Sequence, residues 1–268
     1  MRSAGLRIFA TLCFEPRPVN RIRVGPHELE CAFHGSPGGP TLVFLHEGLG
    51  SVAQWRDFPE KLAASCALPA FVYSRANYGQ SSATAPLPRP VRYMHDEALL
   101  LPEVLRVAGI ADPILIGHSD GASISILYAA DHPVRGMVLE APHVFGEEVG
   151  FASIARAKEA YEKGGLRERL AKYHQNVDAA FYGWNGPWLD PGFRQWNLTD
   201  RLPRIAAPLL VVQGLADEYG TTAQVDAIRG AAAGKVDTVL LEGCGHAPHK
   251  EKPAETLAAM QAFVRSVL

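Results

Sequence analysis

The stretch that decides the fold is DPILIGHSDGASISILYAA, residues 112–130. Its apolar run 113–117 predicts a buried strand, and residues 122–130 have the apolar spacing of a helix. Between them, GHSDG matches the pattern G-x-S-x-G, which requires a strand, a sharp turn and a helix in this order. The glycines let strand and helix approach closely, while the serine occupies a strained turn that leaves its hydroxyl free. Ser119 is therefore the candidate nucleophile.

Similar apolar runs, rich in branched residues, recur on both sides of this stretch and alternate with helical patterns. They predict strands at 41–46, 71–74, 137–140, 208–214 and 236–242, and helices at 52–64, 94–108, 222–233 and 254–268. This alternation predicts a mostly parallel α/β sheet with helices on both faces. Residues 6–34 are more polar and contain a Gly25-Pro26 turn, so we expect an antiparallel edge there.

Residues 146–204 interrupt the alternation, because their pattern is helical without an intervening strand. We expect an α/β core formed by 1–145 and 205–268, with 146–204 as a helical cap above the strand ends, where open α/β sheets bind ligands. Trp184 and Trp188, from the aromatic cluster of this segment, are candidate substrate contacts. The alternative is that most of these aromatics only build the core of the insertion.

A serine hydroxyl is a weak nucleophile near neutral pH, so it needs a base that an acidic residue holds in one tautomer. Asp217 and His246 each follow a predicted strand, and the order Ser, Asp, His is the one expected on this kind of sheet. We predict His246 as general base and Asp217 as its orienting acid. Glu218 and Glu140 are the alternatives to Asp217. His249 is the alternative to His246, and its charged surroundings favour a solvated side chain.

Acyl transfer also requires two donors for the oxyanion. The first candidate is the backbone N–H of Asp120, directly after the serine. The second should come from the glycine-rich turn after residues 41–46, where we choose Gly48 ahead of Leu49. This turn lacks the spacing of phosphate-binding loops. His46 is expected to hold the turn in place rather than to carry a proton.

With these loops in place, the chain resembles the α/β-hydrolase superfamily over nearly its whole length. The resemblance implies the α/β-hydrolase fold, with a mostly parallel eight-stranded sheet, a helical cap after the sixth strand, and Ser119, Asp217 and His246 in their triad roles. The elbow at 119–121 is similar to that of valacyclovirase-like amino-acid ester hydrolases, in which the acid after the serine faces a substrate amine. Glu47 departs from the pattern, because many relatives have glycine there. Residues 74–81 follow the usual D-x-R-G-x-G-x-S turn only in part.

Two carboxylates, Asp120 and Glu47, should lie near the oxyanion hole and would oppose its negative charge unless they meet a cation. A substrate amine would supply that cation. The favoured alternative is that Asp120 complements the N-terminus of its helix while Glu47 pairs with an arginine such as Arg75. Glu47, Leu49 and His143 join the candidate substrate contacts, although a structural role for His143 is left open.

The predicted reaction is hydrolysis of a small-molecule carboxylic ester, or of an amide or thioester, through an acyl-enzyme, with neither metal nor organic cofactor required. Two alternatives remain open. One is a carbon-carbon bond hydrolase of vinylogous diketones, which uses the same triad in capped relatives. The other is a non-catalytic ligand-binding receptor on the same fold.

The composition is that of a soluble globular protein, with 47% hydrophobic and 20% charged residues and a formal net charge of −2. This charge balance argues against a dedicated nucleic-acid-binding protein, because it does not supply the positive electrostatic field that binding to a phosphate backbone requires. The four cysteines lie far apart and form no metal or redox motif, so we expect reduced thiols and a cytoplasmic location. Residues 1–13 lack the features of a signal peptide, and no apolar run reaches the ~20 residues of a membrane span. The expected partner is a small-molecule substrate, and a homodimer is left open.

Overall fold

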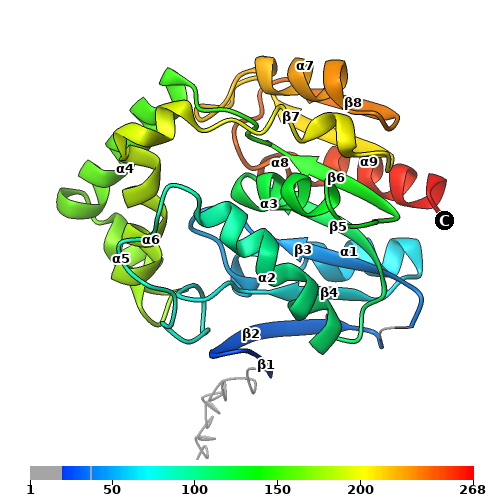
Figure 1. Cartoon of the computed structure of the whole chain (residues 1–268), viewed down its shortest axis with the longest axis horizontal. Coiled ribbons are helices and arrows are strands. Elements are labelled where there is room, and N and C mark those ends of the chain that lie inside the picture. The colour runs from blue at the N-terminus through cyan, green and yellow to red at the C-terminus, as the bar shows by residue number, and fades with distance from the viewer. Residues whose placement is uncertain (1–19, 37) are drawn as a thin grey trace, which may run out of the picture.

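A computed structural model describes residues 20–36 and 38–268, which form an eight-stranded sheet of order β1-β2-β4-β3-β5-β6-β7-β8 (Figure 1). The β1–β2 and β2–β4 pairs are antiparallel and the other neighbours are parallel. The strands are β1 (Asn20–Val24), β2 (His27–His34), β3 (Pro40–Leu45), β4 (Ala70–Tyr73), β5 (Asp112–His118), β6 (Gly136–Glu140), β7 (Leu209–Gly214) and β8 (Val236–Leu241). The predicted mostly parallel sheet with an antiparallel edge is confirmed. Residues 1–19, which include the segment analysed for a signal peptide and the first part of the predicted edge, lie outside the described residues.

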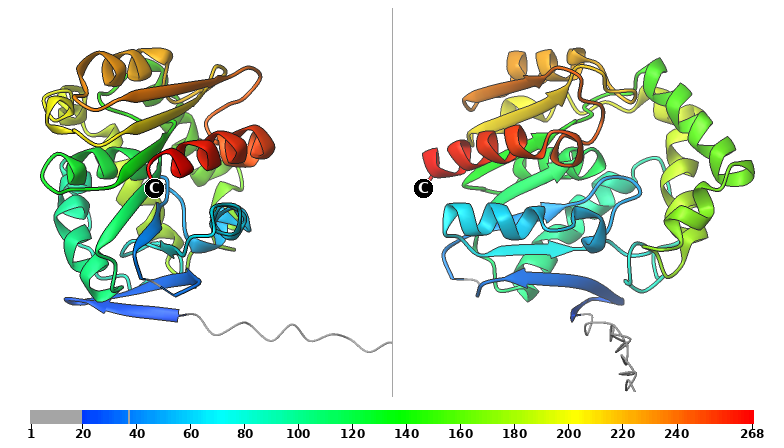
Figure 2. Two further views of the ribbon diagram at one scale, coloured as in Figure 1. Left: turned by 90° about the vertical axis from the view of Figure 1, so that its right-hand side faces the viewer. Right: turned by 180° about the vertical axis from the view of Figure 1, so that it is seen from behind.

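Helices cover both faces of this sheet. One face carries α2 (Tyr93–Val107), α3 (Asp120–Ala129) and α7 (Thr222–Ala231), which are in front or at the top in Figure 1. The view from behind in Figure 2 shows α1 (Phe58–Cys66) and α9 (Pro253–Ser266) over the other face, with the short α8 (Pro248–Glu251) leading into α9. The 3₁₀ turn η1 (Val52–Trp55) precedes α1. The predicted helices all appear, with the first one divided into η1 and α1.

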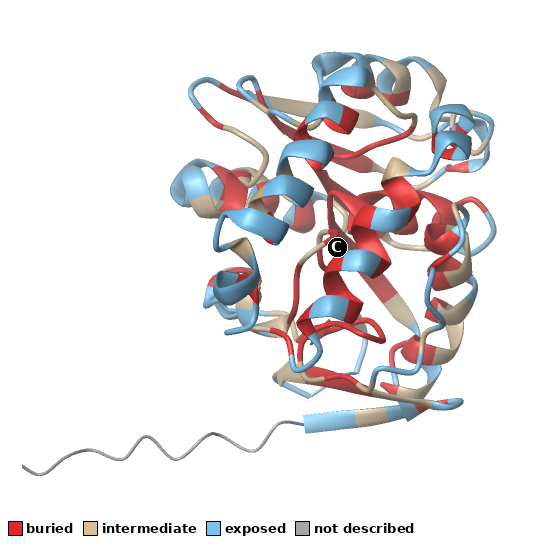
Figure 3. Cartoon of the chain, turned by 90° about the vertical axis from the view of Figure 1, so that its left-hand side faces the viewer, coloured by how far each residue is buried: buried red, intermediate tan, exposed pale blue. Residues whose placement is uncertain are grey.

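The core consists of two apolar layers separated by the sheet. Successive side chains of a strand point to opposite faces, so Val43 and Leu45 pack with α2 and α3 while Leu42 and Phe44 pack with α1 and α9. All of β4, β6 and β7 is buried, as expected for strands with helices on both faces. Figure 3 shows buried residues in the sheet and exposed residues on the outer sides of the helices.

The chain between β6 and β7, which we call the β6–β7 segment (residues 146–204), contains three helices and two 3₁₀ turns: α4 (Glu148–Lys163), α5 (Leu166–Leu170), α6 (Val177–Leu189), η2 (Pro191–Gln195) and η3 (Leu202–Arg204). Its helices lie beyond one end of the sheet (Figures 1 and 2). An antiparallel bridge between Phe145 and Asn197 ties its two ends together. Phe181 and Phe193 are fully buried and stack on neighbouring rings, so much of the aromatic cluster builds the core of this segment.

In the described part of the chain, no helix combines the length and hydropathy needed to cross a bilayer. Cys31, Cys66 and Cys244 are buried free thiols.

Candidate active site

The candidate nucleophile sits on a sharp turn between β5 and α3. Ser119 has φ 54° and ψ −116°, a strained conformation for a residue with a side chain. A Cβ atom at Gly117 would lie 2.4 Å from the carbonyl oxygen of Gly121, and one at Gly121 would lie 2.0 Å from that of Leu45. Both contacts are with backbone, which cannot rotate away. Glycine is therefore required on each side of the serine for β5, α3 and β3 to approach this closely.

This packing leads to a stability prediction for Gly121→Ala. The added methyl group must displace the Leu45 carbonyl, so we expect the free energy of unfolding in urea to fall by about 1–3 kcal/mol. Gly230→Ala is the matched control, since it also lies in a helix but has open space around the new methyl group. It should leave stability unchanged or raise it by up to about 1 kcal/mol. Equal effects of the two substitutions would contradict the steric account of the elbow.

Three predicted residues from distant parts of the chain meet at this turn. His246 Nε2 lies 2.9 Å from Ser119 Oγ, and His246 Nδ1 lies 2.9 Å from each carboxylate oxygen of Asp217. The carboxylate only accepts, so Nδ1 carries the hydrogen and Nε2 is left to accept the serine O–H. Burial by itself would raise the pKa of Asp217, but its contacts with His246 outweigh this and lower the pKa to about 2. The arrangement therefore holds an ionised acid, an imidazole and a hydroxyl in one chain of hydrogen bonds.

Asp217 is itself held in position. Gln213 Nε2 donates to its Oδ2 at 2.8 Å, and the Tyr219 N–H donates to its Oδ1 at 2.7 Å. The alternatives for its role lie elsewhere: Glu218 is exposed, and Glu140 bonds to His249. Of the three acidic candidates, only Asp217 reaches the imidazole.

Two backbone N–H groups are candidates for the oxyanion hole: that of Asp120, directly after the serine, and that of Gly48, which lines the same cavity as Ser119. Asp120 begins α3, so its N–H has no partner within the helix, and neither this group nor the Gly48 N–H has an acceptor among the described residues. The loop that carries Gly48 is fixed by His46, whose Nδ1–H donates to the Glu47 carbonyl at 2.7 Å while its Nε2 accepts the Arg75 N–H at 3.1 Å. Burial and the Arg75 charge hold the pKa of His46 well below its usual range, which suits this neutral, structural role.

The carboxylate after the serine is fully engaged by the protein. Trp188 Nε1 donates to Asp120 at 3.2 Å, Tyr93 Oη donates to its other oxygen, and the Arg75 guanidinium lies 3.9 Å away. Burial raises the pKa of Asp120, although these three partners oppose the shift. Both oxygens of Asp120 thus already have donors.

Glu47 pairs with a different cation from the one expected. Arg75 donates to the main-chain carbonyls of His46 and Glu47, while the Glu47 carboxylate bonds to Lys250 Nζ at 3.0 Å. The expected ion pair with an arginine is therefore wrong, because the guanidinium is occupied by backbone and Asp120. Burial opposes ionisation of Glu47, but Lys250 and His118 more than compensate and hold its pKa well below the usual range.

A cavity of about 110 Å³, partly open to solvent, lies above Ser119 and His246. Its walls include every residue that the sequence suggested as a substrate contact: Glu47, Leu49, His143, Trp184 and Trp188. Gly48, Gly150, Ile154 and Tyr219 complete the lining. Burial and the neighbouring His246 lower the pKa of His143 to about 3, so its imidazole is neutral. The cavity is mainly apolar and aromatic, with the nucleophile at its wall.

Comparison with known proteins places this site in a family. Residues 42–259 match the model of the Alpha/beta hydrolase family. This chain is an α/β hydrolase. The "Putative carbamate hydrolase RutD" of Caulobacter vibrioides is 29% identical over 120 residues, which are 44% of this chain and 43% of that protein. The match therefore spans less than half the length of this curated relative.

Solved structures resemble this α/β hydrolase over most of its length. The 2-hydroxy-6-oxo-6-phenylhexa-2,4-dienoate hydrolase from Rhodococcus sp. strain RHA1 aligns with a TM-score of 0.77 at 16% identity, covering 92% of this chain and 98% of that one. An esterase from Exiguobacterium antarcticum aligns with a TM-score of 0.71 at 18% identity, covering 92% and 100%. At these identities the likeness establishes the shared fold.

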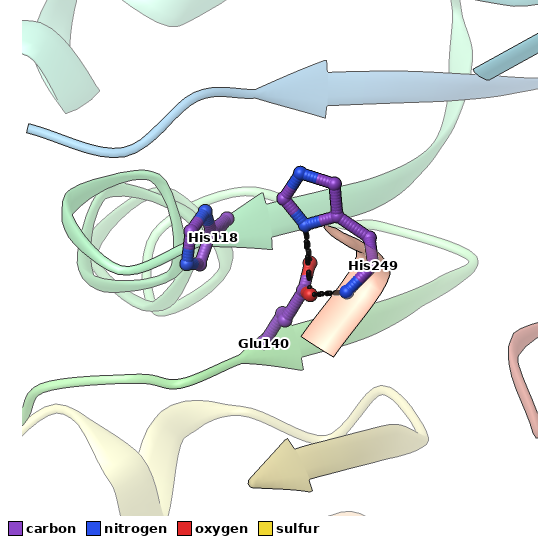
Figure 4. Close-up of side chains that lie close together, drawn as sticks. All are labelled: His118, Glu140 and His249. Atoms are coloured by element: carbon purple, nitrogen blue, oxygen red, sulfur yellow. Dashed lines mark hydrogen bonds and ion pairs between the residues drawn. The ribbon is translucent and has the colours of Figure 1, made fainter. Parts of the chain in front are cut away.

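One group of side chains in this α/β hydrolase has the composition of a metal site. Potential ligand atoms of His118, Glu140 and His249 lie within 4.8 Å of one another, and all three residues are buried (Figure 4). The carboxylate, however, already accepts hydrogen bonds from the N–H and Nδ1–H of His249 at 2.5 and 2.8 Å. These hydrogen bonds within the protein explain why the side chains of Glu140 and His249 lie together. The expectation that His249 is solvated is wrong, since α8 turns it inward onto the end of β6.

Sequence analysis missed several polar residues that support the site. Tyr93 and Lys250 bind the two carboxylates beside the elbow, and His118 contacts the main chain of His246. His118 stands next to the nucleophile, and Lys250 stands four residues after His246. For His118 and Lys250, this proximity to Ser119 and His246 in the chain was the only signal in the sequence, because the groups that they contact come from other loops.

Proposed function

We propose that this α/β hydrolase is a serine hydrolase that cleaves a small, uncharged carboxylic ester through an acyl-enzyme. The observation that carries the proposal is the unbroken chain of hydrogen bonds from Ser119 through His246 to Asp217 at the wall of an apolar cavity. Each member has the role that nucleophilic catalysis needs: a hydroxyl, a neutral base, and an ionised acid that orients the base.

The reaction follows from these positions. Ser119 Oγ attacks the ester carbonyl carbon as His246 Nε2 takes the hydroxyl proton. The resulting oxyanion receives hydrogen bonds from the N–H groups of Gly48 and Asp120, with the start of α3 adding its positive dipole end. His246 then gives the proton to the leaving alkoxide, which departs as the alcohol. Water repeats the sequence on the acyl-enzyme and releases the acid.

The β6–β7 segment acts in this proposal as a cap over the reaction centre. Its helices supply Ile154, Trp184 and Trp188 to the cavity wall, which restricts water and favours a compact apolar acyl or alcohol group. The Trp184 ring packs against the loop after β3 that carries Gly48. A Cβ atom at Gly48 would lie 2.1 Å from that ring.

The state of the two carboxylates argues against a requirement for a substrate amine. Each oxygen of Asp120 already accepts a hydrogen bond from the protein, and Glu47 is paired with Lys250. We therefore expect equal kcat/KM for an aminoacyl p-nitrophenyl ester and its des-amino analogue, measured side by side at neutral pH. A preference of about tenfold or more for the amine, equivalent to ~1.4 kcal/mol, would contradict this account.

A panel of substrates distinguishes the proposal from its alternatives. With p-nitrophenyl acetate, an esterase gives a burst of p-nitrophenolate and then steady turnover. A carbon-carbon bond hydrolase instead prefers a coloured dienol substrate, the chemistry named for the Rhodococcus neighbour. A carbamate belongs in the panel because of the name of the Caulobacter relative. A ligand-binding receptor would turn over none of them and would not react with a fluorophosphonate probe.

A further inference from the structure

A largely buried network of polar and charged side chains lies beside the cavity and contributes only Glu47 to its lining. Its members come from four segments: Glu47 from the loop after β3, His118 from the end of β5, Glu140 from the end of β6, and His249 and Lys250 from α8. These segments lie next to the loop that carries Gly48, to Ser119 and to His246, which must come together for the proposed reaction. Figure 4 shows three of these side chains, His118, Glu140 and His249, close together where β5 and β6 end.

The contacts of His118 link this network to the candidate base. Its Nε2 lies 2.7 Å from the main-chain carbonyl oxygen of His246, which can only accept, so Nε2 carries a hydrogen. Its Nδ1 lies 3.5 Å from the Glu47 carboxylate. His118, which directly precedes Ser119 in the chain, thus contacts both the backbone of the base and the loop that carries Glu47 and Gly48.

The two carboxylates of the network surround the imidazoles. Burial opposes protonation of His118, but Glu140 and Glu47 raise its pKa above the usual value. His249 behaves in the opposite way, since burial lowers its pKa, and it donates Nδ1–H to Glu140. Glu47 has the Lys250 ammonium as its partner at 3.0 Å, and such pairing is how buried charges are normally tolerated.

We propose that His118 is a positioning residue, a buried imidazole whose Nε2–H holds the main-chain carbonyl of His246 and thereby keeps the base within reach of Ser119. This role rests on the proposed function, because it presupposes that Ser119 and His246 react. The His118 side chain is 1% exposed, and it has no part in the cavity lining. It therefore acts through His246, without touching the substrate.

The position of the base is sensitive to this anchor. A displacement of about 1 Å in a reacting group can reduce the rate by about 10²-fold. The His118 ring also lies close to the base, with the two ring centroids 5.2 Å apart. The other groups facing the His246 ring are Asp217, Tyr219 and His143, and of these only Asp217 is charged at neutral pH.

Two substitutions test the anchor. His118→Phe removes the donor, whereas His118→Gln keeps a donor near the Nε2 position. The readouts are the second-order rate of Ser119 phosphonylation by a fluorophosphonate, kcat and KM for p-nitrophenyl acetate, and the thermal midpoint. His95→Phe is the matched control, because His95 is part-buried on α2 and its Nδ1 has no partner among the described residues.

For His118→Phe we expect phosphonylation and kcat to fall about 10- to 100-fold, with KM changed little. His118→Gln should recover most of the wild-type rate, because its amide keeps a donor near the Nε2 position. His95→Phe should match the wild type in all of these rates.

Wild-type rates for His118→Phe would overturn the positioning role alone. If that variant does not fold, a His118→Gln rate no higher than one-tenth of wild type overturns it. A wild-type protein that the probe does not label at Ser119 overturns the proposed function, and the positioning role with it.

Discussion

Replacement of Ser119 by alanine is expected to lower kcat/KM for p-nitrophenyl acetate by about 10⁴- to 10⁶-fold. The hydroxyl is the only group in the cavity that has a base at hydrogen-bond distance, 2.9 Å from His246 Nε2, and an orienting acid behind it. Without it, no acyl-enzyme forms, and only binding and oxyanion stabilisation remain to assist attack by water. The measurement is steady-state hydrolysis with enzyme purified in parallel from both genes.

Ser125→Ala is the control for this substitution. Ser125 is buried in the same helix, α3, and its hydroxyl donates to the Gly121 carbonyl within that helix. It should retain kcat/KM within a few-fold of wild type, at about 1 kcal/mol of stability or less. Retention of activity in Ser119→Ala, with Ser125→Ala equally active, would remove Ser119 from the reaction.

The second large effect is expected from Asp217→Asn, which should lower kcat by about 10⁴-fold. The amide can present its NH₂ group to Nδ1 instead of an oxygen, so the imidazole is no longer held with its hydrogen on Nδ1. The amide is also uncharged, so it no longer stabilises the imidazole when the ring is protonated. The Gln213 and Tyr219 donors, which point at the two carboxylate oxygens, would also meet an NH₂ group on one side. Steady-state kinetics and the thermal midpoint together separate this loss from unfolding.

Glu218→Gln is the matched control, because it removes a neighbouring carboxylate that is exposed and outside the hydrogen-bond chain. It should leave kcat unchanged. Comparable losses from the two substitutions would mean that the net negative charge of the loop, rather than the bond to His246, is what matters.

The sheet and the convergence of Ser119, Asp217 and His246 could be predicted from local pattern. Buried parallel strands give continuous apolar runs, and the short sequence around Ser119 has steric requirements that only glycines meet. Asp217 and His246 were found because each directly follows such a run. Their separation in the sequence did not matter, since parallel strands end at a common edge.

The ion pairs around the site could not be predicted in the same way. His249 lies in a charged stretch that looks solvated, yet it bonds to Glu140, 109 positions earlier in the chain. Glu47 meets Lys250 across 203 positions, while the expected arginine is taken by backbone carbonyls. Such partners are decided by how loops from different strands pack, and no local periodicity records that. The aromatic residues of the β6–β7 segment were ambiguous for the same reason.

Peptide mapping by mass spectrometry after reaction with a fluorophosphonate tests the central claim most directly, because the probe captures an activated serine irreversibly. The account predicts a single adduct on the peptide that contains Ser119 in the wild type, and none in His246→Ala under the same conditions. An adduct on a different serine, or equal labelling of Ser119 without the imidazole, would contradict it.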